Sequence, residues 1–345
     1  MGKEIDFKQL INQSKYDFLR TNEHLKDNIC LLVVGGSHAY GMNTETSDVD
    51  IRGVALNRPE EIIGFQTFEQ FINDATDTTI YSFKKVVDLL VANNPNIIEI
   101  LFTDPRHIIY VSPIGQLLID NRHLFLSQRA FYSFAGFANA QLRKLTNALA
   151  RGSAYPQNEK EKHIKGTLDQ YLLNLPERFK SITGSEIKLT IDKSEKEEFE
   201  EEIFCDINLQ HFPLRDFNGI MNEITATIRN YDKLNNYNRK NGDIKIAKHM
   251  THLVRLYLMG IEILETSNVT VYREKDHELL MDIRNGKYLM EDGSCSQEFL
   301  DYVNQLEKRL QNAKDNTKLS SKPNIKEIEK LVMEVNRKVI RENVF

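Results

Sequence analysis

The sequence predicts an α+β fold, with a small mixed β-sheet near the N-terminus and a largely helical remainder. Residues 30–34 and 49–56 are segments of strand length that are rich in apolar residues. Residues 65–72 and 77–82 are rich in β-branched and aromatic residues and are typical of a β-hairpin. Beyond Pro113 the apolar residues recur mainly at helical spacings. We therefore expect a sheet domain followed by a helical domain.

The helical elements follow from amphipathic patterns and from capping residues. Helices are expected at residues 6–25, 83–92, 244–264 and from 325 onward, with a short helix that starts at Pro59. Asn96 and Glu99 match an N-cap and the acid at its third position, so we expect Glu99 to be a capping residue. The domain boundary is expected near residue 125, which divides the chain into residues 1–125 and 126–345.

Composition and charge limit the class of protein. The chain has 345 residues, of which 41% are hydrophobic and 28% are charged, as in an ordinary soluble globular protein. No apolar run reaches about 18 residues, so we expect no membrane-spanning segment and no membrane partner. The polar N-terminus and the three widely spaced cysteines favour a reducing, cytoplasmic location. The net charge of −5 argues against broad electrostatic binding of duplex nucleic acid.

A glycine turn follows the first predicted strand. Gly35, Gly36 and Ser37 come directly after the apolar residues 31–34, and a short helix is expected to follow them. Glycine permits positive φ and has no Cβ, so backbone N–H groups can approach a phosphate there, and the Ser37 hydroxyl adds a donor. Gly36 and Ser37 are therefore candidate nucleotide-binding residues.

Two carboxylates, at positions i and i+2, begin the second predicted strand. Because strand side chains alternate between faces, Asp48 and Asp50 should project together with Arg52, while Val49 and Ile51 face a core. Mg²⁺ favours one or two carboxylates together with phosphate oxygens and water. Such a strand opposite a glycine turn indicates a site for metal-bound nucleotide phosphates. The alternative is a purely structural polar turn that leads into a strand.

At these residues the chain resembles the DNA polymerase β-like nucleotidyltransferases, whose signature is an apolar strand, Gly-Ser and then Asp-x-Asp. It is similar in particular to the predicted nucleotidyltransferases related to the RNA-repair-associated RlaP family. The segments that carry the likeness are GSHAYG at 36–41, SDVDIRGV at 47–54, NPN at 94–96 with Glu99, and KH at 248–249 with His252 and Arg255. The resemblance implies a polymerase β-like palm in which Asp48, Asp50 and a third carboxylate hold Mg²⁺ or Mn²⁺, with two ions expected.

Two residues compete for the role of third carboxylate, which the resemblance places on a neighbouring strand. Asp77 opens the strand-like segment of residues 77–82, which favours it as a catalytic and metal-binding residue. Asp74 lies upstream in the expected hairpin turn, where an aspartate usually hydrogen-bonds its own backbone. We therefore take Asp77 as the third carboxylate, with Asp74 as the alternative.

A basic stripe is expected on the helix of residues 244–264. Lys245, Lys248, His252 and Arg255 recur at spacings of three and four, which places them on one helix face. Lys248, His252 and Arg255 are candidates for binding triphosphate oxygens or an RNA backbone. For Lys245 a structural role is favoured, and the alternative for the whole stripe is a solvated basic surface.

These features predict a metal-dependent nucleotidyltransferase whose helical domain closes a nucleotide cleft. The enzyme would transfer a nucleoside monophosphate from ATP or another nucleoside triphosphate to an acceptor hydroxyl and release pyrophosphate. The RNA-repair association of the relatives suggests an RNA end or tRNA as acceptor, while a protein or a small molecule is equally compatible with the residues. The alternative from another class is a non-catalytic protein that senses nucleotides or binds a partner.

Overall fold

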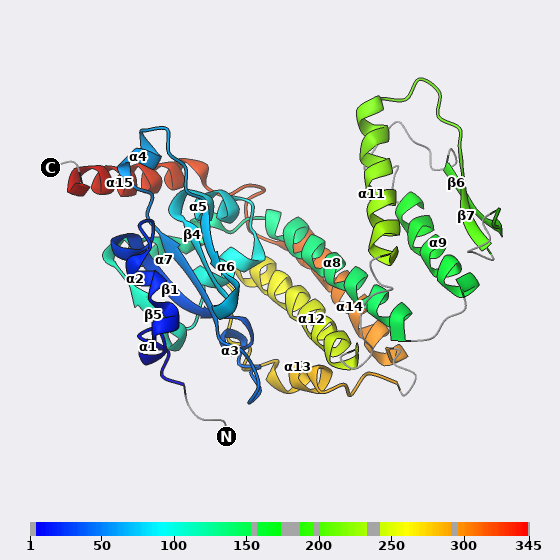
Figure 1. The fold of residues 1–345 in the computed structure, drawn as a ribbon, viewed down its shortest axis with the longest axis horizontal. Helices are drawn as coiled ribbons and strands as arrows, with labels where there is room; N and C mark the ends of the chain where they lie inside the picture. The colour runs from blue at the N-terminus through cyan, green and yellow to red at the C-terminus, as the bar shows by residue number, and fades with distance from the viewer. Residues whose placement is uncertain are drawn as a thin grey trace. The chain divides into compact units, whose positions relative to one another are not determined.

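The structure is a computed structural model that describes residues 5–152, 157–173, 187–195, 201–232, 242–290 and 295–343. It contains two compact units, which are drawn in Figure 1. The first unit consists of residues 1–141, 250–287 and 297–345, and the second consists of residues 142–249 and 288–296. The chain therefore leaves the first unit twice and returns to it each time.

A five-stranded sheet with the order β3-β4-β2-β1-β5 lies in the first unit. Its strands are β1 (Ile29–Gly35), β2 (Asp50–Ala55), β3 (Gln70–Asn73), β4 (Thr78–Ser82) and β5 (Ile108–Val111). β2 and β4 are parallel and the other neighbours are antiparallel, so the sheet is mixed. The predicted α+β class and the predicted hairpin of β3 and β4 are thus confirmed. β5, which the sequence pattern did not predict, pairs with β1 at one edge.

The N-terminal segment covers one face of this sheet. The single helix expected at residues 6–25 is wrong. The segment instead forms four short helical elements: α1 (Phe7–Leu10), η1 (Ser14–Tyr16), α2 (Phe18–Thr21) and η2 (Lys26–Asn28). The side chains of Asn12 and Asn22 hydrogen-bond the local backbone, which competes with a continuous helix. The segment still contributes buried apolar residues, and Tyr16 and Leu19 pack with Ile51 of β2 and Ile80 of β4.

Short helices connect the strands or follow the last of them along the chain. They are α3 (Gly36–Tyr40), α4 (Pro59–Ile62), η3 (Asp74–Thr76), α5 (Phe83–Val91), α6 (Pro95–Leu101), η4 (Pro105–His107), α7 (Pro113–Asp120) and η5 (Arg122–Phe125). α4 and α5 begin where the sequence predicted, at Pro59 and after Ser82, whose side chain caps α5. Alternation along β2 directs Ile51 and Ala55 toward the N-terminal segment and leaves Asp50 and Arg52 on the opposite face.

Three long helices lie side by side in Figure 1. They are α8 (Arg129–Gly152), α12 (Gly242–Thr266) and α14 (Gln297–Asn316). Along the chain, α13 (His277–Arg284) lies between α12 and α14, and α15 (Ile325–Asn343) follows α14. Gly260 of α12 is in close contact with Phe134 of α8 and Leu310 of α14, because a Cβ added to it would lie 3.0 and 3.2 Å from their side chains. The helices expected at residues 244–264 and from 325 are confirmed. Among the described helices, none has the length and apolar character to cross a bilayer.

The second unit has its own small core. It contains α9 (Gln157–Leu173), the antiparallel hairpin of β6 (Ile187–Lys193) and β7 (Glu201–Ile207), and α11 (Leu214–Asp232). Leu168, Ile187 and Ile220 are buried together in this core. The hairpin gives the second unit a two-stranded sheet.

The expected boundary at residue 125 does not coincide with this division. The chain is back in the first unit from Gln297 onward, and within that unit Gln128 N donates to Ser320 O at 2.9 Å and Asn324 N donates to Leu124 O at 3.1 Å. The second unit instead begins within α8. Helical periodicity continues without a break through α8, so a sequence pattern carries no signal for a boundary at that point.

Candidate functional site

The glycine turn at the end of β1 is present and lies against a carboxylate. Gly36 has a φ of +59°, and a Cβ added to it would lie 1.9 Å from Oδ2 of Asp50. Both the positive φ and this close approach require glycine. Ser37 is half-buried, and its carbonyl oxygen accepts a hydrogen bond from Met42 N at 2.8 Å. The turn therefore holds its backbone beside Asp50.

Replacing Gly36 by alanine should disable the site and leave most of the fold intact. The methyl group strains a left-handed backbone by about 1–2 kcal/mol and displaces the Asp50 carboxylate. We expect the affinity for Mg²⁺-bound nucleoside triphosphate, measured by calorimetry, to fall by about tenfold or more. Gly136→Ala in α8 is the matched control, because open space surrounds that position. Equal nucleotide affinity in the two variants would contradict this role for Gly36.

Asp50 begins β2 and forms an ion pair with Arg52 on the same face of the strand. Arg52 Nη2 lies 2.8 Å from Asp50 Oδ1, and the two side chains are 29% and 25% exposed. Arg52 Nη1 also donates to the carbonyl oxygen of Asp77 at 2.5 Å. The guanidinium thus connects the Asp50 carboxylate to the residue that precedes β4. The prediction that Arg52 lies in phase with Asp50 is confirmed.

Asp48 lies in the segment that leads into β2 and is exposed. Its neighbours Val49 and Ile51 pack into the core below the N-terminal segment, which confirms the predicted alternation. A polar turn precedes Asp48, in which Ser47 Oγ accepts from Thr44 N at 2.8 Å. The structural alternative therefore accounts for the polar turn at residues 44–47.

The two candidates for the third carboxylate differ in their position relative to β2. Asp77 has a φ of +44°, and its carbonyl oxygen accepts from Ile51 N at 3.1 Å. It therefore adjoins the strand that carries Asp50, although it precedes β4 instead of lying in it. Asp74 is exposed and lies in η3, in the connection between β3 and β4 where a turn was expected.

The described part of the chain contains no group of three His, Cys, Asp or Glu residues arranged to hold a metal ion. Asp48, Asp50 and Asp77 therefore do not form a preassembled centre of three carboxylates. Burial first, and the Asp77 carboxylate second, raise the pKa of Tyr16, a buried residue of the N-terminal segment. Asp48 and Asp50 alone still match the one or two carboxylates with which Mg²⁺ combines phosphate oxygens and water.

The basic stripe expected on α12 is not formed. Lys248 is exposed and His252 is half-buried, but Arg255 has only 4% of its surface exposed. The reason is that α12 is buried on nearly all sides from Met250 onward, as expected for a helix that is apolar around its circumference. The side chain of Lys245 lies outside the described residues. The prediction of one exposed basic face that includes Arg255 is therefore wrong.

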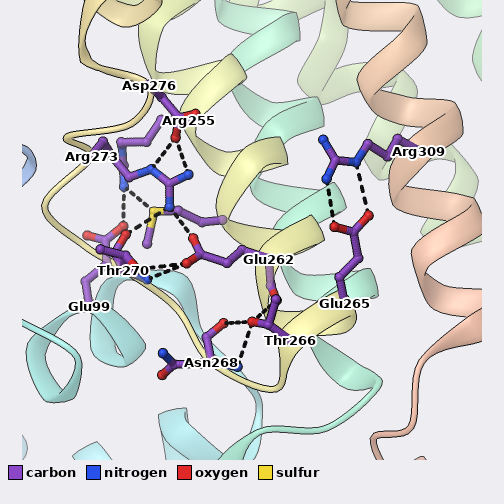
Figure 2. A network of polar contacts seen from close by, with 11 residues as sticks. Glu99, Arg255, Glu262, Glu265, Thr266, Asn268, Thr270, Arg273, Asp276 and Arg309 are labelled. Carbon is purple, nitrogen blue, oxygen red and sulfur yellow. Dashed lines mark hydrogen bonds and ion pairs between the residues drawn. The ribbon is translucent and has the colours of Figure 1, made fainter.

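Glu99 is the partner of Arg255, and the capping role expected for it is also wrong. Asn94 caps α6, because its side chain accepts from Asn96 N at 3.0 Å and Pro95 occupies the first helical position. Glu99 lies within α6, is buried, and accepts a hydrogen bond from Arg255 Nη1, as Figure 2 shows. This ion pair joins two elements that are far apart in the sequence.

Tyr40, the last residue of α3, completes this buried cluster. Its hydroxyl donates to Glu99 Oε2 at 2.6 Å, and the Arg255 guanidinium carbon lies 3.7 Å from the centre of its ring. Burial raises the pKa of Tyr40 far above its usual range; Arg255 opposes this shift, and Glu99 and Asp50 add to it. Tyr40 therefore stays protonated at neutral pH. The sequence did contain a signal for the cluster, because Glu99 and Arg255 each interrupt an otherwise apolar helical run.

Comparison with known proteins gave a family match for the part of the chain that contains the sheet. Residues 7–165 match a family model that is described as RlaP, the RNA repair pathway DNA polymerase beta family. Over these residues the chain is similar to that family. The RlaP match includes all five strands of the sheet, and with them Asp48, Asp50 and Asp77, so it confirms the resemblance drawn from the Gly-Ser and Asp-x-Asp motifs. Neither the comparison with curated proteins nor that with solved structures gave a match.

Proposed function

We propose that this protein is a metal-dependent nucleotidyltransferase, which moves a nucleoside monophosphate from a nucleoside triphosphate to an acceptor hydroxyl and releases pyrophosphate. The observation that carries the proposal is the contact between Gly36 and Asp50 in a sheet that matches the RlaP family. Only glycine fits at this point, so the backbone of the turn and the carboxylate of β2 are held next to each other. This arrangement suits a ligand that needs amide donors and a metal-binding oxygen at the same place.

Each residue of the site has a proposed role. Asp48 and Asp50 would hold Mg²⁺ or Mn²⁺, with Asp77 as the third carboxylate. Ions bound there would neutralise phosphate charge and favour ionisation of the attacking hydroxyl. Gly36 and Ser37 bind triphosphate oxygens through backbone and hydroxyl donors. Arg52 can exchange the Asp50 carboxylate for a phosphate oxygen, because a guanidinium binds both groups. On α12, His252 is proposed to contact the triphosphate, and the exposed Lys248 is proposed to contact RNA.

An RNA end, including that of tRNA, is the proposed acceptor. Its support is the RNA-repair family that residues 7–165 match. The net charge of −5 means that an RNA strand must be bound by a local group of cations, because the molecule as a whole repels it. Exposed Lys248 is one such cation.

Transfer of a labelled nucleotide tests this function directly. The purified protein is incubated with each α-labelled nucleoside triphosphate and Mg²⁺, and with separate pools of RNA, tRNA, protein and metabolites. We expect label on RNA, release of pyrophosphate, and loss of both when a chelator is present. Label on a protein or a metabolite would replace RNA as the acceptor. Metal-dependent nucleotide binding without transfer to any pool would support a nucleotide-sensing protein instead.

The third carboxylate is tested by comparing two neighbouring aspartates. Asp77→Asn removes a charge beside β2, and we expect it to lower the transfer rate by about a hundredfold, whereas Asp74→Asn should change it by less than about twofold. Asparagine tolerates the left-handed backbone of residue 77, so the variant should fold normally. Transfer rates at saturating Mg²⁺ and triphosphate provide the measurement. The reverse order of the two variants would assign the role to Asp74.

A further inference from the structure

A buried polar cluster joins α3, α6 and α12 within the first unit. Its members are Tyr40, Glu99 and Arg255, which are only 6%, 9% and 4% exposed. Glu99 is central, because one of its oxygens accepts from the Tyr40 hydroxyl and the other accepts from Arg255 Nη1. The Arg255 guanidinium in turn lies over the Tyr40 ring, so each member contacts the other two.

The energy of folding does not by itself explain a charged pair at this position. Removing Glu99 and Arg255 from water costs several kcal/mol for each ion, and an apolar pair of similar volume usually stabilises a core at least as well. Arg255 Nε is also buried without a hydrogen-bond partner among the described residues. A buried ion pair with an unsatisfied N–H group is explained if its directional hydrogen bonds fix the relative positions of the helices, which an apolar contact would fix less precisely.

The geometry that it fixes is that of α3. This short helix runs from Gly36 to Tyr40, so its first residue lies against Asp50 and its last residue is held by Glu99 and Arg255. The carbonyl oxygen of Tyr40 also accepts from Arg273 N at 3.1 Å. Because Gly36 lies so close to the Asp50 carboxylate, a small shift of α3 would change the position of the turn relative to that carboxylate.

We infer that Glu99 and Arg255 are positioning residues of the nucleotide site, which act through Tyr40 to hold the turn at Gly36 and Ser37 beside Asp50. This inference rests on the proposed function and names support residues for the same site. It assigns to Arg255 the task of holding Tyr40 from within the core, in place of direct contact with the triphosphate. A displacement of about 1 Å at a reacting centre can cost a hundredfold in rate, so such support has a measurable effect.

The test compares variants of the cluster with a matched ion pair on the same helix. Tyr40→Phe removes one hydroxyl and keeps the ring, and Glu99→Gln removes the charge and keeps the shape. Glu265→Gln is the control, because Glu265 of α12 pairs with Arg309 of α14, as Figure 2 shows. For each full-length variant we would measure the melting temperature, the Kd of Mg²⁺-bound triphosphate, and kcat and KM for both substrates.

We expect Tyr40→Phe and Glu99→Gln to lower kcat/KM for the triphosphate by about tenfold to a hundredfold, with KM for the acceptor unchanged. Glu265→Gln should keep kcat/KM within about twofold of the wild-type value. The inference is overturned if Tyr40→Phe has wild-type kinetics, or if Glu265→Gln loses as much kcat/KM as the cluster variants. Tyr40→Phe decides the matter if Glu99→Gln does not fold.

The wild-type protein separates this inference from the proposed function. Wild-type protein that neither binds Mg²⁺-bound triphosphate nor transfers a nucleotide overturns the proposed function, and the positioning role with it. Wild-type protein that binds and transfers, together with an unaffected Tyr40→Phe variant, overturns the positioning role alone.

Discussion

Asp50→Asn should lower the rate of nucleotidyl transfer by about a hundredfold to a thousandfold, and Asp48→Asn should have an effect of the same order. Each substitution keeps the shape of the side chain and removes the charge that attracts a divalent ion. Steady-state transfer over a range of Mg²⁺ concentrations measures the effect. A higher Mg²⁺ requirement in the variants would further link the loss to metal binding.

The stability of the Asp50→Asn variant provides the control for this prediction. Neutralising one of two repelling carboxylates would raise the melting temperature, but Asp50 is paired with Arg52 in the structure. We therefore expect a small loss of at most about 1 kcal/mol, as for an exposed ion pair. Asp88→Asn, which removes the surface pair with Lys84, should match it in stability and retain full activity. Full activity in both the Asp48 and Asp50 variants would refute the enzymatic proposal.

Arg255→Ala should destabilise the protein by about 3–5 kcal/mol, because it leaves the buried Glu99 carboxylate without its counter-ion. It also removes the guanidinium that lies over the Tyr40 ring. Urea denaturation followed by circular dichroism would report the change. The second unit is monitored separately with a probe in α11, since two-state analysis does not hold across two units.

Lys248→Ala is the matched control, because Lys248 lies on the same helix and is exposed. Its effect on stability should remain within about 0.5 kcal/mol. Combining Arg255→Met with Glu99→Gln should restore much of the stability, since neither charge is then left unpaired in the core. Equal stability of Arg255→Ala and Lys248→Ala would mean that the buried pair contributes nothing to folding.

Local patterns were sufficient for the elements that surround the candidate site. The apolar strand, the glycine turn and the alternating second strand were predicted at β1, Gly36 and β2, because each depends on short-range properties of the backbone. The N-terminal helix was wrong for a local reason, since Asn12 and Asn22 bond the nearby backbone instead of extending it. The resemblance to the RlaP family used the same short motifs, and the family match confirms it.

The sequence by itself indicated the candidate residues for a metal-bound nucleotide, and the tertiary structure decided which charged residues are buried and with which residues they pair. Arg255 has the helical spacing of a basic stripe, yet it lies in the core because α12 is surrounded by other helices. Glu99 has the spacing of a capping residue, yet it pairs with Arg255 and Tyr40 across three elements. Spacing along one helix fixes the face on which a side chain lies, whereas its solvation depends on what packs against that face. That packing depends on contacts between residues far apart in the chain, such as Glu99 and Arg255, which helical periodicity does not encode.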